Sequence, residues 1–226
     1  MMELEKVKFH PWIGRESPWD EQGHKRKQYD PRGTILSPNI HLLVLGESHY
    51  GVDNNDKKIT EKVVKEWVFE NKCKYPFFDN ISSVLMADGQ SAWSSEKRSK
   101  IWNQIAFYNF VQVSVGCNGQ HRPTKEMFKD SYGAFLEVLK KLNPTHIWVC
   151  GKVLWGGMPG KDCDVMDFER RKEIRPGKMV GENGIYKFND LAIPALATWH
   201  PSPRFRKFIC DDWRPIVRQF LEFPID

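Results

Sequence analysis

The chain has 226 residues, of which 40% are hydrophobic, 28% charged and 13% aromatic. This composition is ordinary for a soluble globular protein, and the length suits one domain, residues 1–226, better than two. No apolar run approaches the roughly 18 residues that a membrane-spanning helix needs, which excludes such a helix. The formal net charge of +5, with a pI near 8.9, is compatible with a phosphate-bearing partner but is too small to require one.

The cysteines indicate a reducing compartment. They are odd in number and scattered, without a Cys-x-x-Cys pair: Cys73, Cys117, Cys150, Cys163 and Cys210. With no apolar signal sequence, we expect free thiols and a cytoplasmic location. Four clustered thiolates for an iron–sulfur cluster are missing, and Cys117 with His121 is interpreted as a coincidental metal-like pair. We therefore expect neither a metal nor a cofactor.

The first half of the chain predicts two strands and two helices after an irregular N-terminal arm. The arm, residues 1–38, is rich in proline and charge, and a buried-type strand, His41–Leu45, follows it. Thr60 is a candidate cap for a helix that runs to about Asn71, and Asp79–Ala87 is a shorter helix. The polar stretch Ser91–Lys100 is expected to be exposed. Ile105–Val113 is the second predicted strand.

The second half continues the alternation of helix and strand. Thr124 is a candidate cap for the most regular helix, whose apolar positions recur every three or four residues: Phe128, Tyr132, Phe135, Leu139 and Leu142. Thr145–Cys150 is the third predicted strand, and Gly151–Trp155 begins a turn or helix. Residues 156–189 suggest an insertion with short antiparallel strands. Ile193–Thr198 is the fourth strand and Asp211–Phe220 the closing helix.

This order of elements predicts an α/β fold. We expect a three-layer α/β/α sandwich around a small, mainly parallel, four-stranded sheet. In such a sheet, ligands bind beyond the carboxyl ends of the strands. Two polar clusters occupy such positions, Gly46-Glu47-Ser48-His49-Tyr50 after the first strand and His200-Pro201-Ser202-Pro203 after the last. The two prolines restrict the histidine loop, which is what a positioned imidazole requires.

Together the two clusters resemble the motifs of the uracil-DNA glycosylase superfamily, whose last motif is a histidine loop that begins His-Pro-Ser. One glycosylase group carries Gly-Gln-Asp-Pro-Tyr after the first strand, and its Asp positions the attacking water. Another group carries Gly-Glu-Ala-Pro-Gly, where the Glu is functional. This chain shares Glu47 with the second pattern and Tyr50 with the first, and Ser48 stands where the water-positioning Asp would be.

Two further segments match the family in the expected order. In Pro76-Phe77-Phe78-Asp79-Asn80, the resemblance implies that Phe77 stacks on the extruded base, whereas two adjacent phenylalanines also suit a core. In Phe107-Tyr108-Asn109-Phe110, it implies that the Asn109 amide reads the base edge. A backbone network is the alternative partner for that amide.

The resemblance implies a base-flipping hydrolase of DNA repair that cleaves the N-glycosidic bond. Its catalytic residues would be Glu47, Ser48 and His200, and its base-binding residues Gly46, Tyr50, Phe77 and Asn109. A last group would contact DNA: Ser202, Arg204, Phe205, Arg206 and Lys207. We expect DNA, single- or double-stranded, as the partner of a monomer that binds no membrane.

Two other functions remain open on the sequence. A non-catalytic nucleic-acid or nucleobase binder could keep the glycosylase fold, since fold does not guarantee function. In that case the Glu47 carboxylate would point away from the base. A serine hydrolase would pair Ser48 with His200, although the second glycine of a nucleophile elbow is missing.

Overall fold

The computed structural model describes residues 4–15, 33–70, 72, 75–87, 94–160, 163–164, 166–202 and 208–223. Within these residues the chain forms the strands β1 (Trp12–Ile13), β2 (Leu42–Gly46), β3 (Ala106–Asn109), β4 (His146–Cys150), β5 (Asp167–Ile174), β6 (Gly181–Phe188) and β7 (Leu191–Thr198). The helices of the same residues are α1 (Ile59–Val64), the π-helical η1 (Lys65–Phe69), α2 (Pro76–Leu85), α3 (Ser95–Trp102), α4 (Lys125–Asp130), α5 (Tyr132–Leu142), α6 (Lys152–Gly157) and α7 (Cys210–Leu221).

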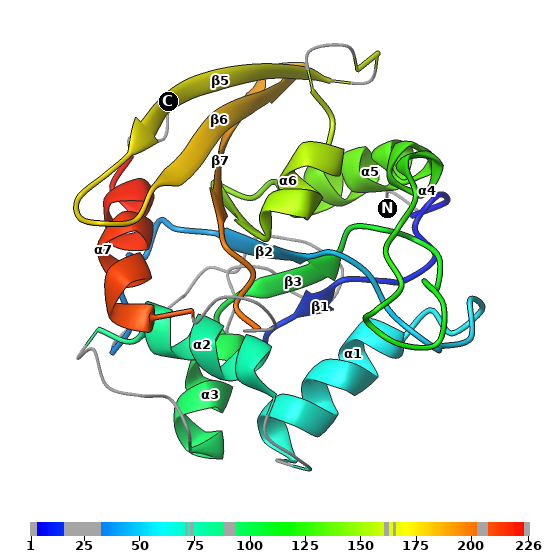
Figure 1. Ribbon diagram of the computed structural model, residues 1–226, viewed down its shortest axis with the longest axis horizontal. Helices are drawn as coiled ribbons and strands as arrows, with labels where there is room; N and C mark the ends of the chain where they lie inside the picture. The colour runs from blue at the N-terminus through cyan, green and yellow to red at the C-terminus, as the bar shows by residue number, and fades with distance from the viewer. Residues whose placement is uncertain are drawn as a thin grey trace.

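The strands form one mixed sheet of seven strands among the described residues, in the order β1-β3-β2-β4-β7-β6-β5. Strands β3, β2, β4 and β7 are parallel neighbours, which confirms the α/β class and the parallel centre. The predicted size of four strands is wrong, because antiparallel strands extend both sides: β1 pairs with β3, and β6 and β5 follow β7 (Figure 1).

Strand β2 is internal, as expected for the strand that precedes the first cluster. It is hydrogen-bonded to β3 on one side and to β4 on the other, so that Leu45 lies opposite both Tyr108 and Val149. All five residues of β2 are buried, which explains its continuous apolar sequence.

Helices lie on both faces of the sheet (Figure 1). Leu42 and Val44 of β2 face a core that α1, η1, α2, α3 and α7 cover, whereas Leu43 and Leu45 face a core that α4, α5 and α6 cover. Alternate side chains of β2 therefore pack into two different cores, one on each face of the sheet. Both faces are covered, so a site can form only from the loops at the strand ends.

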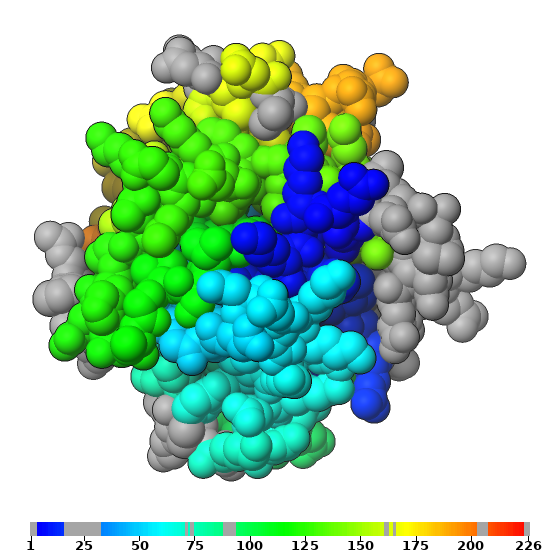
Figure 2. Space-filling model, turned by 90° about the vertical axis from the view of Figure 1, so that its right-hand side faces the viewer, coloured from blue at the N-terminus to red at the C-terminus, as the bar shows by residue number. Residues whose placement is uncertain are grey.

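Part of the predicted irregular arm is ordered structure. Strand β1 extends the sheet, and the Trp12 indole donates to the backbone oxygen of Trp102 at 2.9 Å. The amides of Lys8 and Phe9 both donate to Gln112 Oε1 at 2.9 Å. In Figure 2 this N-terminal segment lies between the segments coloured cyan and green. It packs against the loops that follow β2 and β3.

The predicted elements of residues 105–142 have different ends. The second strand is shorter than Ile105–Val113, since β3 ends at Asn109. The predicted helix after Thr124 exists, and Thr124 caps it, but it is divided into α4 and α5 at Ser131. Ser131 Oγ donates to the backbone oxygen of Met127 and accepts the amide of Gln112, and these contacts hold the break.

The helices of residues 59–102 also differ from the prediction. The helix expected from Thr60 changes into π-helical η1 at Lys65, and the second helix begins at Pro76, three residues before the predicted start. The stretch predicted to be polar and exposed, Ser91–Lys100, overlaps most of α3. Arg98 of α3 is only 1% exposed and pairs with buried Asp79 of α2 at 2.6 Å.

Two strands within residues 156–189, β5 and β6, belong to the sheet. Strands β5 and β6 are antiparallel, as expected, but eight residues long each, and β6 pairs with β7 from Leu191 to Ala197. The two strands of this segment extend the sheet beyond β7. No helix of the described residues is long and apolar enough to cross a membrane.

Candidate functional site

The carboxyl ends of the parallel strands bring the two predicted clusters to the same edge of the sheet. Glu47 follows β2, Asn109 ends β3, Gly151 follows β4 and His200 lies two residues beyond β7. Adjacent strands are about 4.8 Å apart, so β2 and β7, with β4 between them, lie about 10 Å apart. The prediction that Glu47 and His200 share one sheet edge is confirmed.

Gly46 ends β2 against the side chain of Asn109. A Cβ on residue 46 would lie 2.2 Å from Asn109 Oδ1 and 3.0 Å from Phe107 Cζ. Only glycine allows this approach, because real side chains do not tolerate such contacts. Gly46 therefore makes room for the Asn109 amide at the strand end.

The His200 ring is exposed, and its orientation is fixed by its own loop. The amide of Ser202 donates to His200 Nδ1 at 3.1 Å, so the neutral ring carries its proton on Nε2. Asn80 Nδ2 of α2 donates to the backbone oxygen of Pro201 at 2.6 Å, which ties the loop to α2. Gly151, at φ +132°, lies under the ring, and an added Cβ would be 3.5 Å from His200 Cδ2.

Phe77 connects His200 to the core. Its ring is 5.3 Å from the imidazole, at an interplanar angle of 38°, and 5.7 Å from the ring of Phe107. Phe77 is only 5% exposed, and Phe78 beside it packs on Trp102. The pair is thus part of the core, while Phe77 also borders the site.

The Glu47 carboxylate lies beside Arg122 and Tyr50. Arg122 Nη2 donates to Oε2 at 2.7 Å, and the Tyr50 hydroxyl is 3.4 Å from Oε1. Glu47 is 6% exposed. Burial raises the pKa of Glu47, and the opposing effects of Arg122 and the Tyr50 hydrogen bond are smaller. Burial also raises the pKa of Tyr50, which remains a neutral donor.

Ser48 does not form a nucleophile–base pair. It lies beside the Tyr50 hydroxyl, but its Oγ is buried and has no hydrogen-bond partner of good geometry in the described part of the chain. A serine hydrolase needs a hydrogen bond between Ser48 and His200, and the structure has none.

His49 is a site residue to which the sequence assigned no role. It is 4% exposed, and its Nε2 lies 3.1 Å from Asn109 Nδ2 and 3.0 Å from Thr60 Oγ1. Phe9 of the N-terminal segment packs on the ring at 5.1 Å in a T-shaped arrangement. Burial lowers the pKa of His49 to about 4, so the ring is neutral at physiological pH. The Asn109 amide thus contacts the His49 ring, a side-chain partner and not the backbone network that was the alternative to base reading.

The loop between β3 and α4 holds the first cluster by main-chain hydrogen bonds. The amide of Val111 donates to Glu47 O, that of Val115 to His49 O, and that of Gly51 to Gly116 O, at 2.7–2.9 Å. Arg122 comes from this loop. No motif around Arg122 indicates a role, and only the folded loop places it beside Glu47.

The predicted residues therefore form two groups at one sheet edge. Gly46, Phe77, Asn109 and His200 lie on the side of α2, where Phe107 touches Gly46 and Phe77. Glu47 and Tyr50 lie with Arg122 under the β3–α4 loop.

Most of the predicted DNA-contacting residues lie outside the described residues: Arg204, Phe205, Arg206 and Lys207. Ser202 is described. Its hydroxyl is buried, has no hydrogen-bond partner among the described residues and lies in the loop that fixes His200.

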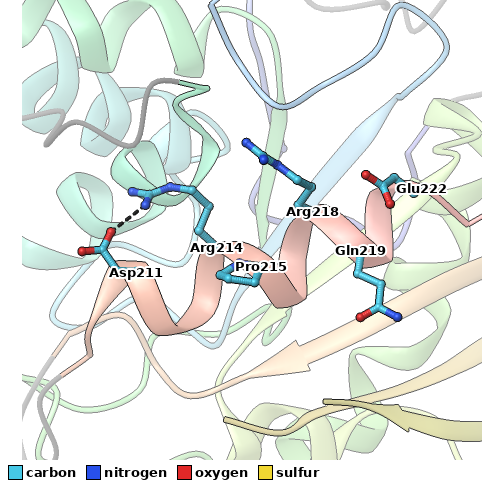
Figure 3. A pocket seen from close by; sticks show the side chains of 6 residues that line it. All are labelled: Asp211, Arg214, Pro215, Arg218, Gln219 and Glu222. Atoms are coloured by element: carbon cyan, nitrogen blue, oxygen red, sulfur yellow. Dashed lines mark hydrogen bonds and ion pairs between the residues drawn. The ribbon is translucent and has the colours of Figure 1, made fainter. Parts of the chain in front are cut away.

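The described residues contain no group of three or more His, Cys, Asp or Glu side chains placed to hold a metal ion. A surface hollow of about 250 Å³ lies elsewhere, on α7 (Figure 3). Its lining residues are Asp211, Arg214, Pro215, Arg218, Gln219 and Glu222. In Figure 3 Asp211 pairs with Arg214, and the side chains come from α7 and from Glu222, the residue that follows its end. This hollow shares no residue with the strand-end site.

No protein-family model matches the chain, and no curated protein is similar to it in sequence.

Proposed function

We propose that the protein is a DNA glycosylase-like hydrolase that binds a flipped-out nucleobase and hydrolyses its N-glycosidic bond. The observation that supports this most directly is the common sheet edge, where an oriented His200, Phe77 and the Gly46–Asn109 contact accompany a buried carboxylate, Glu47. The four components match what the chemistry requires: a donor for the leaving base, an aromatic surface, a polar base contact and a group for water or the sugar.

The reaction divides between the two groups of the site. When the C1′–N bond breaks, its electron pair stays on the departing base, and the Nε2–H of His200 stabilises that negative charge. The sugar becomes cationic, and the Glu47 carboxylate stabilises it. Water oxygen then bonds to C1′ while one of its protons passes to Glu47, which gives an abasic sugar and the base anion. Glu47 returns to its ionised form by releasing this proton to solvent, and the base takes up a proton in turn.

Base selection involves the residues around Gly46. Phe77 provides the aromatic edge of the site and Asn109 its amide, and Tyr50 limits the space beside Glu47. Duplex DNA would present the base only after flipping it out of the stack.

One observation favours a second function, a non-catalytic nucleobase or nucleic-acid binder. Glu47 is engaged by Arg122 and Tyr50, and Ser48 supplies no carboxylate at the usual water-positioning place. A protein with this arrangement would keep the base-binding side of the site and lose hydrolysis.

Formation of abasic sites tests the proposal, in single- and double-stranded oligonucleotides that carry uracil, hypoxanthine or xanthine. We expect slow excision, particularly of uracil, and a loss of about 10²-fold or more in His200→Ala, since removing one preorganised donor typically costs that much. His10→Ala, which alters a histidine of the N-terminal segment, is the matched control and should retain the rate. Excision that survives both His200→Ala and Glu47→Ala contradicts the mechanism. Binding without excision of any substrate supports the second function.

A further inference from the structure

Arg122 is the charged residue of the site to which neither the motifs nor the proposed reaction gives a role. Its side chain is 52% exposed, while the Glu47 side chain that it contacts is 6% exposed. The ion pair thus joins a cation at the surface to a carboxylate inside the protein, at 2.7 Å between Nη2 and Oε2.

The local chain fixes where the Arg122 guanidinium lies. Pro123 follows Arg122 and restricts its backbone to extended conformations. Thr124 then caps α4, since its hydroxyl accepts the amide of Met127. On the other side, main-chain hydrogen bonds from Val111, Val115 and Gly51 tie the loop to the segment that carries Glu47. The backbone of Arg122 is therefore held in place on both sides, which limits where its flexible side chain can reach.

The charged and titratable groups that act on Glu47 come from two elements. Arg122 lies on the β3–α4 loop, and Tyr50 on the loop of Glu47 itself. His49 lies between Glu47 and Tyr50 in the sequence, but its ring contacts Asn109 and Thr60. This ring is neutral. Arg122 is thus the one cation that contacts Glu47 among the described residues, and it opposes the effect of burial on this carboxyl.

We propose that Arg122 is a positioning residue that keeps Glu47 an anion in one orientation and thereby makes it competent for the reaction. The catalytic consequence rests on the proposed function, whereas the effect on Glu47 does not. Arg122 touches neither base nor sugar in this mechanism and acts through Glu47 alone.

The first test measures Glu47 directly by ¹³C-detected titration of its carboxyl group, with the resonance assigned by its loss in Glu47→Gln. In Arg122→Gln we expect the pKa of Glu47 to rise by roughly one unit relative to the wild type, because an adjacent arginine typically lowers a carboxyl pKa by 1–3 units. Arg122→Lys should restore much of the wild-type value. Because Arg122 is half exposed, these variants are expected to fold.

Arg170→Gln is the matched control, because Arg170 is also an exposed arginine near a carboxylate, 3.6 Å from Glu182. It should leave the titration of Glu47 unchanged. An Arg122→Gln variant in which Glu47 titrates as in the wild type overturns the proposal.

The second test is the pH dependence of base excision. If Glu47 must be ionised, the acidic limb of the rate profile should move to higher pH in Arg122→Gln by the same amount as the carboxyl titration, and return in Arg122→Lys. A lower rate with an unmoved limb would show a purely structural role and overturn the proposal. If the wild type excises no base, the proposed function fails, and the carboxyl titration alone decides the inference on Arg122.

Discussion

At two positions of the site, Gly46 and Gly151, the close approach of a neighbouring side chain or the backbone conformation favours glycine. Gly46 has no side chain because the Asn109 amide occupies the space that a Cβ would take. Gly151 has a backbone conformation, at φ +132°, that other residues rarely adopt, and it lies against His200. Both glycines stand at the ends of parallel strands, where the main chain closely approaches a polar side chain of the candidate site.

The change Gly46→Ala tests this close approach. The new methyl would lie 2.2 Å from Asn109 Oδ1, so the amide or the strand must move. We expect a loss of about 1–3 kcal/mol in the free energy of unfolding, measured by urea denaturation. Gly156→Ala is the control, since no atom lies within 4 Å of its added Cβ, and it should be neutral or slightly stabilising in helix α6.

A double-mutant cycle identifies the clash. Asn109→Ala removes the Oδ1 atom that the new methyl group would meet. The losses in unfolding free energy from Gly46→Ala and Asn109→Ala should therefore be less than additive in the double variant. Additive losses would show that Asn109 is not what excludes a side chain at position 46.

The burial of the Glu47 carboxylate should lower the stability of the protein at neutral pH, although the proposed reaction needs this carboxylate ionised. Its folded pKa lies above the ordinary value of 4.5, so the folded state binds the proton more tightly than the unfolded state. Stability is therefore lost as pH rises from 4.5 through the folded pKa, and at pH 7 the buried carboxylate carries the full cost. Glu47→Gln avoids this cost, and we expect it to be more stable than the wild type at pH 7 while losing base excision.

Urea denaturation of this variant at pH 7 and pH 4 gives the measurement, and the gain should shrink at the lower pH. Glu169→Gln is the control, because Glu169 is an exposed carboxylate paired with Lys187 on the β5–β6 hairpin. It should show no comparable gain at pH 7. A Glu47→Gln variant that is less stable at pH 7 would contradict the stated balance between burial and Arg122.

At the scale of elements, the sequence predicts best the parts whose pattern is local. The buried runs of β2, β4 and β7 were found nearly to the residue, because a continuous apolar run bounded by polar residues specifies a buried parallel strand. The closing helix α7 was found for a similar reason, through the spacing of Trp213, Ile216 and Phe220.

The elements that depend on distant partners were missed. Strand β1 has two residues and exists only because it pairs with β3. Antiparallel strands were expected near β5, but its length was not, because β5 is mostly exposed and has no apolar pattern. In the site, Glu47 and His200 follow strands and were found, whereas Arg122 and the contacts of His49 arise from loop packing that no local pattern encodes.

The division between α4 and α5 gives an element-scale prediction. Apolar spacing alone predicts one helix, but Ser131 accepts the Gln112 amide at 3.1 Å and donates to Met127 O at 2.8 Å. Ser131→Ala leaves that buried amide without its partner, so we expect a loss of about 1–2 kcal/mol in unfolding free energy despite the better helix propensity of alanine. Lys140→Ala, on the same helix pair but without a hydrogen bond to the loop, should change stability little.

At the scale of the whole molecule, the modest charge of +5 limits any binding of DNA. We expect weak to moderate affinity that falls steeply with salt, because phosphate contacts release counterions. The triple change of Arg204, Arg206 and Lys207 to alanine, outside the described residues, should lower affinity for all sequences alike and flatten the salt dependence. Binding assays at several salt concentrations measure this. Unchanged binding would assign the interface elsewhere, for example to Lys25, Arg26 and Lys27.

Acid stability is a property of the whole fold to which two buried histidines contribute. His49 lies at the carboxyl end of the parallel strands and His146 begins β4 at the opposite end, where its ring packs on Phe220 at 5.1 Å. Burial lowers the pKa of each to about 4, against 6.5 for an ordinary histidine. The unfolded state therefore binds protons first as the pH falls.

Stability should consequently decline between about pH 6.5 and pH 4, by roughly 3 kcal/mol for each histidine at pH 4, a large part of the 5–15 kcal/mol typical of a domain. In the middle of this window each histidine contributes a slope of up to about 1.4 kcal/mol per pH unit. Urea denaturation across the window measures this slope. In His146→Gln or His49→Gln we expect the slope to lose the contribution of one histidine, and in the double variant the contributions of both. The substitutions also cost packing at neutral pH, but that loss is independent of pH and leaves the slope as the readout. Slopes equal to that of the wild type in all three variants would mean that neither histidine is held neutral by the fold.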